Sequence, residues 1–386
     1  MVSRVAIATF IALCLAWAYQ PPSLAATELG GFRFIGSVDT MKLSKDQASS
    51  GFTSSDAQAI DLASAMAASH ITVNTPIEYP SVMLEWANRI HQDGKHVWFR
   101  LSSAKGGGLP HADASKGLYY QAPYDGYPDF HRGYLTKLHQ LMIAYPGLVR
   151  PGDILDGDAE AENSAWWKKN YGCRVQQSCT PCPDITKMTA AHYPCAPISE
   201  MNRFLQVMTA QENRDLASLG IPACQSITSS NCVLTQVHST DPGTATGQLS
   251  TATVQAMGNL ITVDAYPDEN TTTPSTAAAA WVESLHSWES AWLNKGVSAT
   301  ILVGEWGYCL KKEVTDATQE AVIKAEVTNA FPTIPYLAGT NYWVGPGSAS
   351  YGTYANIFTQ NLSGAWSLRP AANDVSAFYA AMNGAR

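Results

Sequence analysis

The feature that most constrains the fold is a regular alternation of short apolar runs with helix-like segments. Eight runs have the length and composition of strands, at residues 33–38, 70–75, 95–101, 152–158, 232–238, 259–266, 298–304 and 336–344. Helical patterns occupy residues 54–69, 80–94, 132–145, 198–219, 249–258, 275–295, 316–330 and 372–383. Strands that alternate with helices predict a parallel sheet, and eight such pairs predict a single (β/α)8 barrel, an α/β fold.

Local signals support this division of the chain. The segment 80–94 begins at a proline and ends at a glycine, the usual asymmetry of a helix. Ser54 or Ser55 is the expected N-cap of the first long helix. An open, doubly wound sheet is the alternative fold, and the lack of a glycine-rich phosphate loop after the first strand disfavours it.

The first residues have the layout of a secretory signal. Arg4 precedes an apolar run that extends from Val5 to Tyr19, and small residues follow two prolines. The run is short for a bilayer crossing, so we expect a signal peptide at 1–25, cleaved near Ala25 or Ala26, rather than a membrane anchor. The mature chain, 26–386, is then one barrel domain that is secreted or periplasmic, with no membrane attachment.

Composition narrows the range of partners. Hydrophobic residues make up 46% and charged residues 15% of the chain, as in a compact globular protein. The net charge is -8 and no basic run is present, so nucleic acid is not an expected partner. Most of the 11 Trp must pack in the core, and Trp281, Trp288 and Trp292 share one helical face. Others have the flat apolar faces on which sugar rings stack.

Cysteine usage fits an exported protein. Of 8 cysteines, Cys14 lies in the leader, and the others are Cys173, Cys179, Cys182, Cys195, Cys224, Cys232 and Cys309. The four in 173–195 have spacings that a zinc site also shows, but in an oxidising compartment two disulfides are favoured. Cys224 and Cys232 are candidates for a further bridge. Cys309 is a candidate for the unpaired thiol, and the connectivity is open.

In a (β/α)8 barrel the active site lies at the C-terminal ends of the strands. The chain places chemically active side chains there, namely Ser37, Asp39, Asn74, Glu78, Tyr79, Arg100, Asp156, His238, Asp264, Tyr266, Glu305, Tyr342 and Trp343. Glu305 is notable because it ends an apolar run with no Lys or Arg close in sequence. A lone glutamate in this position is more often a simple strand cap.

The fourth strand ends in an acidic ladder of Asp156, Asp158, Glu160 and Glu162. Alternate residues of a strand share a face, so four like charges would repel one another there. Such a face must open into a cleft, hold a cation or raise some carboxyl pKa values; a strand that ends early in a solvated loop is the alternative. The fourth and seventh strands thus each offer a carboxylate at one end of the barrel, the arrangement that glycoside hydrolysis requires.

At these residues the sequence resembles the large clan of retaining glycoside hydrolases built on (β/α)8 barrels. Gly304-Glu305-Trp306-Gly307 is similar to the G-E-[FW]-G motif that carries the clan's nucleophile. The resemblance implies that Glu305 is the nucleophile, that Tyr266 hydrogen-bonds it, and that Trp343 stacks on sugar. From its place beside Glu305, Trp306 is further expected to shield the carboxylate from water and to bind substrate.

The fourth strand departs from the clan's pattern. The clan has Asn-Glu-Pro where this chain has Ala159-Glu160-Ala161, so the resemblance gives Glu160 the acid/base role, with Glu162 as second choice. Ala159 cannot bind the sugar 2-hydroxyl as the clan's Asn does, and Asn163 or Asp158 is expected to compensate.

The loop after the fourth strand is long and holds a tryptophan pair and four cysteines. We expect disulfides to brace this insertion as a wall of the substrate cleft, with Trp166 or Trp167 as a stacking platform; a passive flap is the alternative. Arg100 and His238 are expected to line the cleft, or else to pair with the acidic ladder.

The sequence therefore predicts a secreted retaining glycosidase that acts on a poly- or oligosaccharide without a metal or other cofactor. Two alternatives belong to other classes. One is a carbohydrate-binding barrel without catalysis, which the missing Asn favours. The other is a metal-dependent hydrolase using the acidic ladder, which the shortage of strand-end histidines disfavours. The sugar, its linkage, endo or exo action and the oligomeric state are open.

Overall fold

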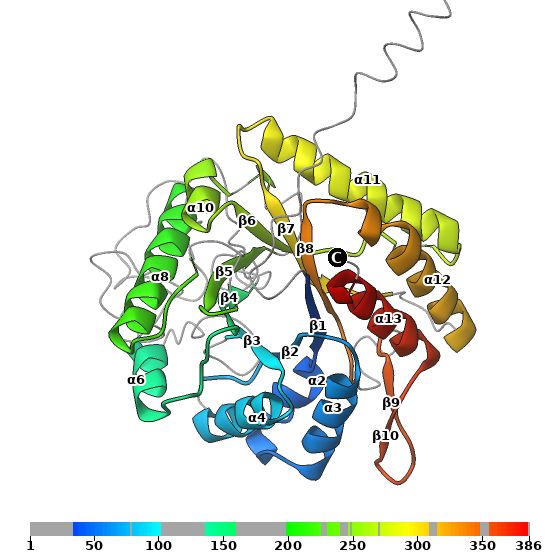
Figure 1. Ribbon diagram of the computed structural model, residues 1–386, viewed down its shortest axis with the longest axis horizontal. Helices are drawn as coiled ribbons and strands as arrows, with labels where there is room; N and C mark the ends of the chain where they lie inside the picture. Colours follow the sequence, from blue (N-terminus) through cyan, green and yellow to red (C-terminus); the bar gives the residue numbers. More distant parts are fainter. Residues whose placement is uncertain are drawn as a thin grey trace, which may run out of the picture.

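Eight parallel strands form a closed barrel in sequence order (Figure 1). They are β1 (Ile35–Asp39), β2 (His70–Val73), β3 (His96–Arg100), β4 (Ile154–Ala159), β5 (Leu234–Ser239), β6 (Leu260–Asp264), β7 (Thr300–Trp306) and β8 (Leu337–Tyr342). The computed structural model describes residues 34–77, 79–101, 136–159, 198–224, 230–239, 246–247, 249–268, 271–308, 315–347 and 355–384. The predicted (β/α)8 barrel is confirmed, with each expected strand in its place.

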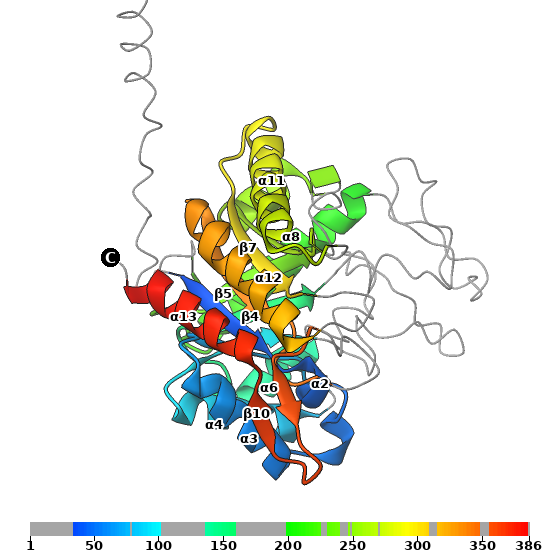
Figure 2. The same ribbon diagram turned by 90° about the vertical axis from the view of Figure 1, so that its right-hand side faces the viewer.

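Helices surround the barrel, and Figures 1 and 2 show them outside the strands. They are α3 (Ser54–Ala65), α4 (Pro80–Gln92), α6 (Thr136–Ala144), α8 (Ile198–Ser218), α10 (Thr251–Ala256), α11 (Pro274–Leu293), α12 (Asp316–Asn329) and α13 (Pro370–Gly384), with a short α2 (Met41–Ser44) after β1. All eight predicted helices are present. The N-cap of α3 is Thr53 instead of Ser54 or Ser55, because Thr53 and Asp56 form a reciprocal capping box.

Side chains alternate between the barrel interior and the helix layer. Ile35, Trp98 and Leu302 belong to a small apolar cluster inside the barrel. Val38 and Val303 belong to the larger cluster between strands and helices. Because both faces of every strand are buried, the strands read as continuous apolar runs, which is why they were recognisable from sequence.

Helix α11 confirms the core assignment of its tryptophans. Trp281 and Trp292 are fully buried, while Trp288 is half-buried against the same cluster. Trp281 meets Phe331 edge-to-face, with ring centroids 4.9 Å apart. Within the described ranges, none of the helices combines the length and hydrophobicity that a bilayer crossing requires.

A hairpin beyond β8 was not predicted. Its strands, β9 (Phe358–Gln360) and β10 (Trp366–Leu368), pair antiparallel outside the barrel (Figure 1). Each has three residues, too short for an alternating pattern to appear. The hairpin is tied to α3 because the Trp366 indole donates to Ser55 Oγ at 2.8 Å.

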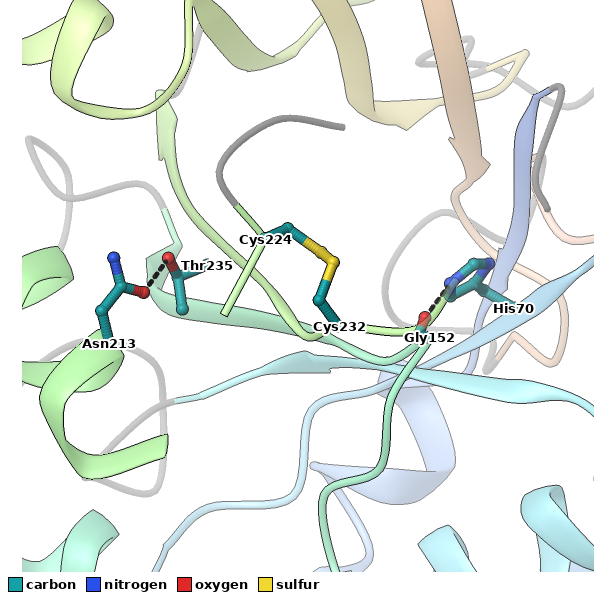
Figure 3. The surroundings of a disulfide bond; sticks show 6 residues. All are labelled: His70, Gly152, Asn213, Cys224, Cys232 and Thr235. Carbon is teal, nitrogen blue, oxygen red and sulfur yellow. Dashed lines mark hydrogen bonds between the residues drawn. A yellow bond between two sulfur atoms is a disulfide. The ribbon is translucent and has the colours of Figure 1, made fainter. Parts of the chain in front are cut away.

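A disulfide joins Cys224 and Cys232, as the sequence suggested, and closes the turn between α8 and β5 (Figure 3). Next to it, His70 Nε2 hydrogen-bonds the Gly152 carbonyl at 2.9 Å, and Thr235 donates to Asn213 at 2.8 Å. The leader, the insertion with its four cysteines, and Cys309 lie outside the described residues. The signal peptide and the braced insertion therefore stay predictions.

The disulfide should stabilise the fold measurably. Replacing both Cys224 and Cys232 by serine should lower the free energy of unfolding by roughly 2–3 kcal/mol, because the bridge restricts the unfolded chain. Urea denaturation of the variant and the parent measures the difference. The single Cys224→Ser variant is the matched control and should lose as much as the double variant. An unchanged midpoint in the double variant would contradict the prediction.

Candidate active site

The C-terminal mouth of the barrel is lined by polar side chains from seven strands or the residues that follow them. Above the apolar interior cluster, the inward positions are Asp39, Asn74, Arg100, Asp156, Asp264, Glu305 and Asn341. Six of them are no more than 5% exposed, and Glu305 is 13% exposed. A buried polar layer of this kind is costly unless its members bind one another, so their contacts define the site.

A bulge in β7 turns Glu305 into the barrel. Val303 pairs with Val263, but the next pair joins Glu305 to Asp264, so β7 has one extra residue at Gly304. Strict alternation from the outward Val303 would have placed Glu305 toward the helices. The inserted residue reverses the phase, and the glutamate faces the mouth. A glycine inside a strand is the sequence signal for such a bulge.

Arg100 is the cation that contacts the carboxylates of this layer among the described residues. Its guanidinium forms an ion pair with Glu305 and lies 3.4 Å from Asp39, 3.7 Å from Asp264 and 3.9 Å from Asp156. Burial alone would lower the pKa of Arg100, but these four carboxylates together raise it well above its ordinary value. Arg100 is therefore permanently charged and holds four strands by electrostatic attraction.

Tyr266 and Trp343 complete the surroundings of Glu305. The Tyr266 hydroxyl donates to Glu305 Oε2 at 3.0 Å, the contact that the family resemblance implied. The Trp343 ring meets Tyr266 edge-on, with centroids 6.3 Å apart, and Lys42 Nζ lies 5.7 Å from the indole centroid. Arg100, Tyr266 and Trp343 are thus brought together beside Glu305.

Trp306 lies elsewhere, which corrects the expectation that it contacts substrate. It is fully buried and packs against Phe331 and Tyr342, with centroids 4.8 and 4.9 Å apart. The bulge that directs Glu305 inward directs the next residue outward, into the helix layer. Trp306 therefore anchors β7 from behind and does not shield the carboxylate from the substrate side.

The remaining predicted site residues are described in part or not at all. Glu160 follows β4 and lies outside the described residues, as do Glu162, Asn163 and Trp166. His238 belongs to β5, but its side chain is not described. The strict alternation expected of the acidic ladder does not hold, because Asp156 pairs with Gln236 and Ala159 with His238, leaving one extra residue in β4.

Sequence reasoning underrated several members of the polar layer. Asp39, Asn74 and Asp264 were recognised as strand-end residues but given no role, and Asn341 was missed. Asn341 accepts from Thr72 at 2.8 Å and donates to the Gly304 carbonyl at 2.8 Å. The sequence could have indicated Asn341, because it precedes Trp343 by two residues and alternate residues of a strand share a face.

A second buried acid pair lies behind the site. Asp268 follows β6, and Glu326 belongs to α12; both are almost fully buried. The two carboxyl groups repel each other when both are ionised, which favours a proton on one of them. Burial, and then the charge of Asp268, raise the pKa of Glu326 well above its ordinary value. Within the described part of the chain, no His, Cys, Asp and Glu cluster has the arrangement of a metal site.

Comparison with known proteins places the fold. No protein-family model and no curated protein match the sequence. Among solved structures, a GH5_18 protein from Streptomyces cattleya in complex with GlcNAc is 12% identical, with a TM-score of 0.60 over 93% of this chain and 82% of that one. A broad-specificity GH5-4 endoglucanase from Clostridium longisporum is 12% identical, with a TM-score of 0.54 over 92% of this chain and 97% of that one.

A Bacteroidetes-affiliated GH5 cellulase linked with a polysaccharide utilization locus is also similar. It is 12% identical, with a TM-score of 0.54 over 92% of this chain and 93% of that one. At this identity the likeness concerns the fold. The chain has the (β/α)8 barrel found in these glycoside hydrolases, as the motif resemblance implied.

The acid pair should make stability depend on pH. The folded protein keeps a proton on Glu326 that an unfolded glutamate loses near pH 4.3, so the free energy of unfolding should fall as pH rises above about 5. Glu326→Gln keeps a hydrogen-bond donor and removes the titration, so its stability should fall less over this range. Urea denaturation at pH values between about 5 and 8 measures both slopes.

The matched control is Glu320→Gln on the same helix, where the side chain is only half-buried. It should keep the slope of the parent protein. Equal slopes for the Glu326→Gln variant and the parent would contradict a proton held on Glu326 in the folded protein.

Proposed function

We propose that this protein is a secreted glycoside hydrolase that cleaves O-glycosidic bonds in a poly- or oligosaccharide by the retaining mechanism. The observation that carries the proposal is the setting of Glu305. A bulge directs its carboxylate into the mouth of the barrel, where the Tyr266 hydroxyl and the Arg100 guanidinium contact it. The similarity in fold to solved glycoside hydrolases supports the same assignment.

In this mechanism Glu305 attacks the anomeric carbon while a second carboxylic acid protonates the departing oxygen. Water, deprotonated by that second group, then releases the sugar from Glu305 with overall retention. Both groups must lie on opposite sides of the scissile bond, roughly 5–5.5 Å apart. Glu160 directly follows β4 in the sequence, and the parallel strands β4 and β7 end on the same side of the barrel. We therefore assign Glu160 the acid/base role, with Glu162 as the second choice.

The contacts of Glu305 suit a nucleophile. A nucleophilic carboxylate must be ionised at the moment of attack, and a neighbouring guanidinium favours the ionised form. Arg100 supplies this charge on one carboxylate oxygen. Tyr266 donates to the other oxygen, which fixes the plane of the carboxylate. The nucleophile is thus oriented before substrate arrives, so less ordering is required in the transition state.

We assign substrate binding to the residues around this pair. Trp343 meets Tyr266 at the mouth, and we assign it the sugar-stacking role that the family resemblance implies. Asn163, Trp166 and His238 complete the proposed cleft and carry over from the sequence. No cofactor enters the reaction. Asp156, the first carboxylate of the acidic ladder, lies 3.9 Å from the Arg100 guanidinium. Its partner is therefore a side-chain cation, which favours this proposal over a metal site at the ladder.

The assignment of the two carboxylates is tested by substitution. Glu305→Gln should abolish hydrolysis of 2,4-dinitrophenyl β-cellobioside and of soluble β-glucans. Glu160→Gln should lower turnover of the polysaccharide by roughly 10²–10⁴-fold, because its leaving group needs a proton. Azide should restore release of dinitrophenol in Glu160→Gln and leave Glu305→Gln inactive.

Glu162→Gln is the matched control for the acid/base and should stay active. Full activity of both Glu160→Gln and Glu305→Gln would overturn the assignment. Parent protein that binds glycans across a panel without releasing reducing sugar would instead identify a binding barrel. Loss of activity in EDTA would identify a metal-dependent hydrolase.

The Tyr266 contact predicts a smaller effect. A hydrogen bond to a charged group contributes about 1.5–3 kcal/mol, so Tyr266→Phe should lower kcat/KM by roughly tenfold to a hundredfold. Tyr308→Phe is the matched control, because that buried hydroxyl donates to the Thr271 carbonyl and does not contact Glu305. Steady-state kinetics should show a larger loss of kcat/KM in Tyr266→Phe than in Tyr308→Phe. Equal losses in the two variants would show that Tyr266 affects activity only by stabilising the fold.

A further inference from the structure

Asp39, at the end of β1, is a carboxylate of the polar layer that is bound on both oxygens. It has no exposed surface. Oδ1 accepts from the Met41 backbone N–H at 2.7 Å and from Asn74 Nδ2 at 3.0 Å. Oδ2 accepts from Asn341 Nδ2 at 3.1 Å and lies 3.4 Å from Arg100 Nη1. All four partners are donors, so only a carboxylate, with acceptors on both oxygens, satisfies the position.

The donors are themselves fixed. Thr72 Oγ1 donates to Asn341 Oδ1 at 2.8 Å, which turns the amide nitrogen of Asn341 toward Asp39. Three neutral donors and one cation thus hold Asp39 in a single position. Burial raises the pKa of Asp39, and Arg100 opposes that shift. Because every partner donates to it, the ionised Asp39 carboxylate is held as a negative charge on the β1 side of the mouth.

Arg100 divides its attraction between Asp39 and the proposed nucleophile. The same nitrogen, Nη1, contacts both Asp39 Oδ2 and Glu305 Oε1. A guanidinium paired with Glu305 alone would favour the ionised carboxylate strongly and make it a weak nucleophile. A second carboxylate on the same nitrogen lowers that attraction and also repels charge on Glu305.

We propose that Asp39 is a positioning residue for the reaction: it holds Arg100 toward β1 and balances its charge, so that Glu305 is ionised and still reactive. The role rests on the proposed function of Glu305, but the charge coupling between the two carboxylates does not. Asp39 acts only through Arg100 and by its own field. It touches neither the proposed substrate site nor the anomeric carbon.

The electrostatic surroundings fix the sign of the effect. Among the described side chains, the charged and titratable groups of this layer are Arg100 from β3, Asp156 from β4, Asp264 from β6, Tyr266 after β6, Glu305 from β7 and, on α2, Lys42, which lies 3.5 Å from Asp46. When the Asp39 charge is removed, the attraction of Arg100 for Glu305 is no longer offset by Asp39. Glu305 then becomes easier to ionise, so it should titrate at lower pH.

Carbon-13 NMR of protein labelled at glutamate Cδ tests the coupling without any ligand. The resonance absent from Glu305→Gln identifies Glu305, and its shift is followed with pH in the parent and in Asp39→Asn. The titration midpoint of Glu305 should fall by roughly one pH unit in Asp39→Asn. Asp39→Ser removes the same charge with a smaller side chain and should move the midpoint in the same direction by a similar amount.

Asp153→Asn is the matched control. Asp153 is equally buried, before β4 at the opposite end of the barrel, where it accepts from Val97 N at 2.8 Å and from His91 Nε2 at 3.0 Å. Its loss should lower the melting temperature and leave the Glu305 midpoint in place. The Asp39→Ser result decides the matter if Asp39→Asn fails to fold.

An unmoved Glu305 midpoint in Asp39→Asn, or in Asp39→Ser should the first not fold, would overturn the proposal and leave Asp39 a structural role only. Kinetics provide the separate readout. With 2,4-dinitrophenyl β-cellobioside, kcat of Asp39→Asn should fall at unchanged KM, and the acid limb of the pH profile should move down with the NMR midpoint. An inactive parent protein with a shifted NMR midpoint would contradict the proposed function and retain the coupling.

Discussion

The arrangement of the barrel mouth depends on the buried guanidinium of Arg100. Among the described residues, Arg100 faces Asp39, Asp156, Asp264 and Glu305 within a largely buried layer. Burying any one of these charges alone would be prohibitive, and each carboxylate is tolerable because the guanidinium is shared. Four strands besides β3 supply the anions, so the ion cluster can form only when the barrel has closed. Closure of the fold and assembly of the site are therefore the same event.

The apolar parts of the barrel give that cluster its support. Inside the strands, Trp98 and Leu302 fill the space beneath the polar layer. Outside, Trp306 packs between Phe331 and Tyr342 and fixes β7 against the helices. Because β7 is packed on both faces, the extra residue at Gly304 can be accommodated only by reversing the side-chain direction of the residues that follow. Glu305 must point into the mouth, and its direction is decided by packing that it does not itself contact.

The predictable part of the structure is the part that depends on local pattern. Continuous apolar runs mark the strands because both faces are buried, and helix signals such as Pro80 and Gly94 mark the ends of helices. The capping box at Thr53 shows the limit of such signals, since neighbouring Ser54 and Ser55 are equally good caps by type. The β9–β10 hairpin was missed because its strands are stabilised by Ser55 and other distant residues, not by their own pattern.

The sequence by itself determined the barrel and the end of the barrel at which chemistry belongs, through periodicity and strand direction. It also suggested the Cys224–Cys232 pair from short spacing, and it drew attention to Glu305 through the motif resemblance. Only the tertiary structure decided which side chains share the mouth. It excluded Trp306 by the phase change at Gly304 and brought in Asn341 and Asp39 through hydrogen bonds between distant strands. Contacts of that kind depend on side-chain phase and barrel closure, and neither is encoded within any single stretch of the chain.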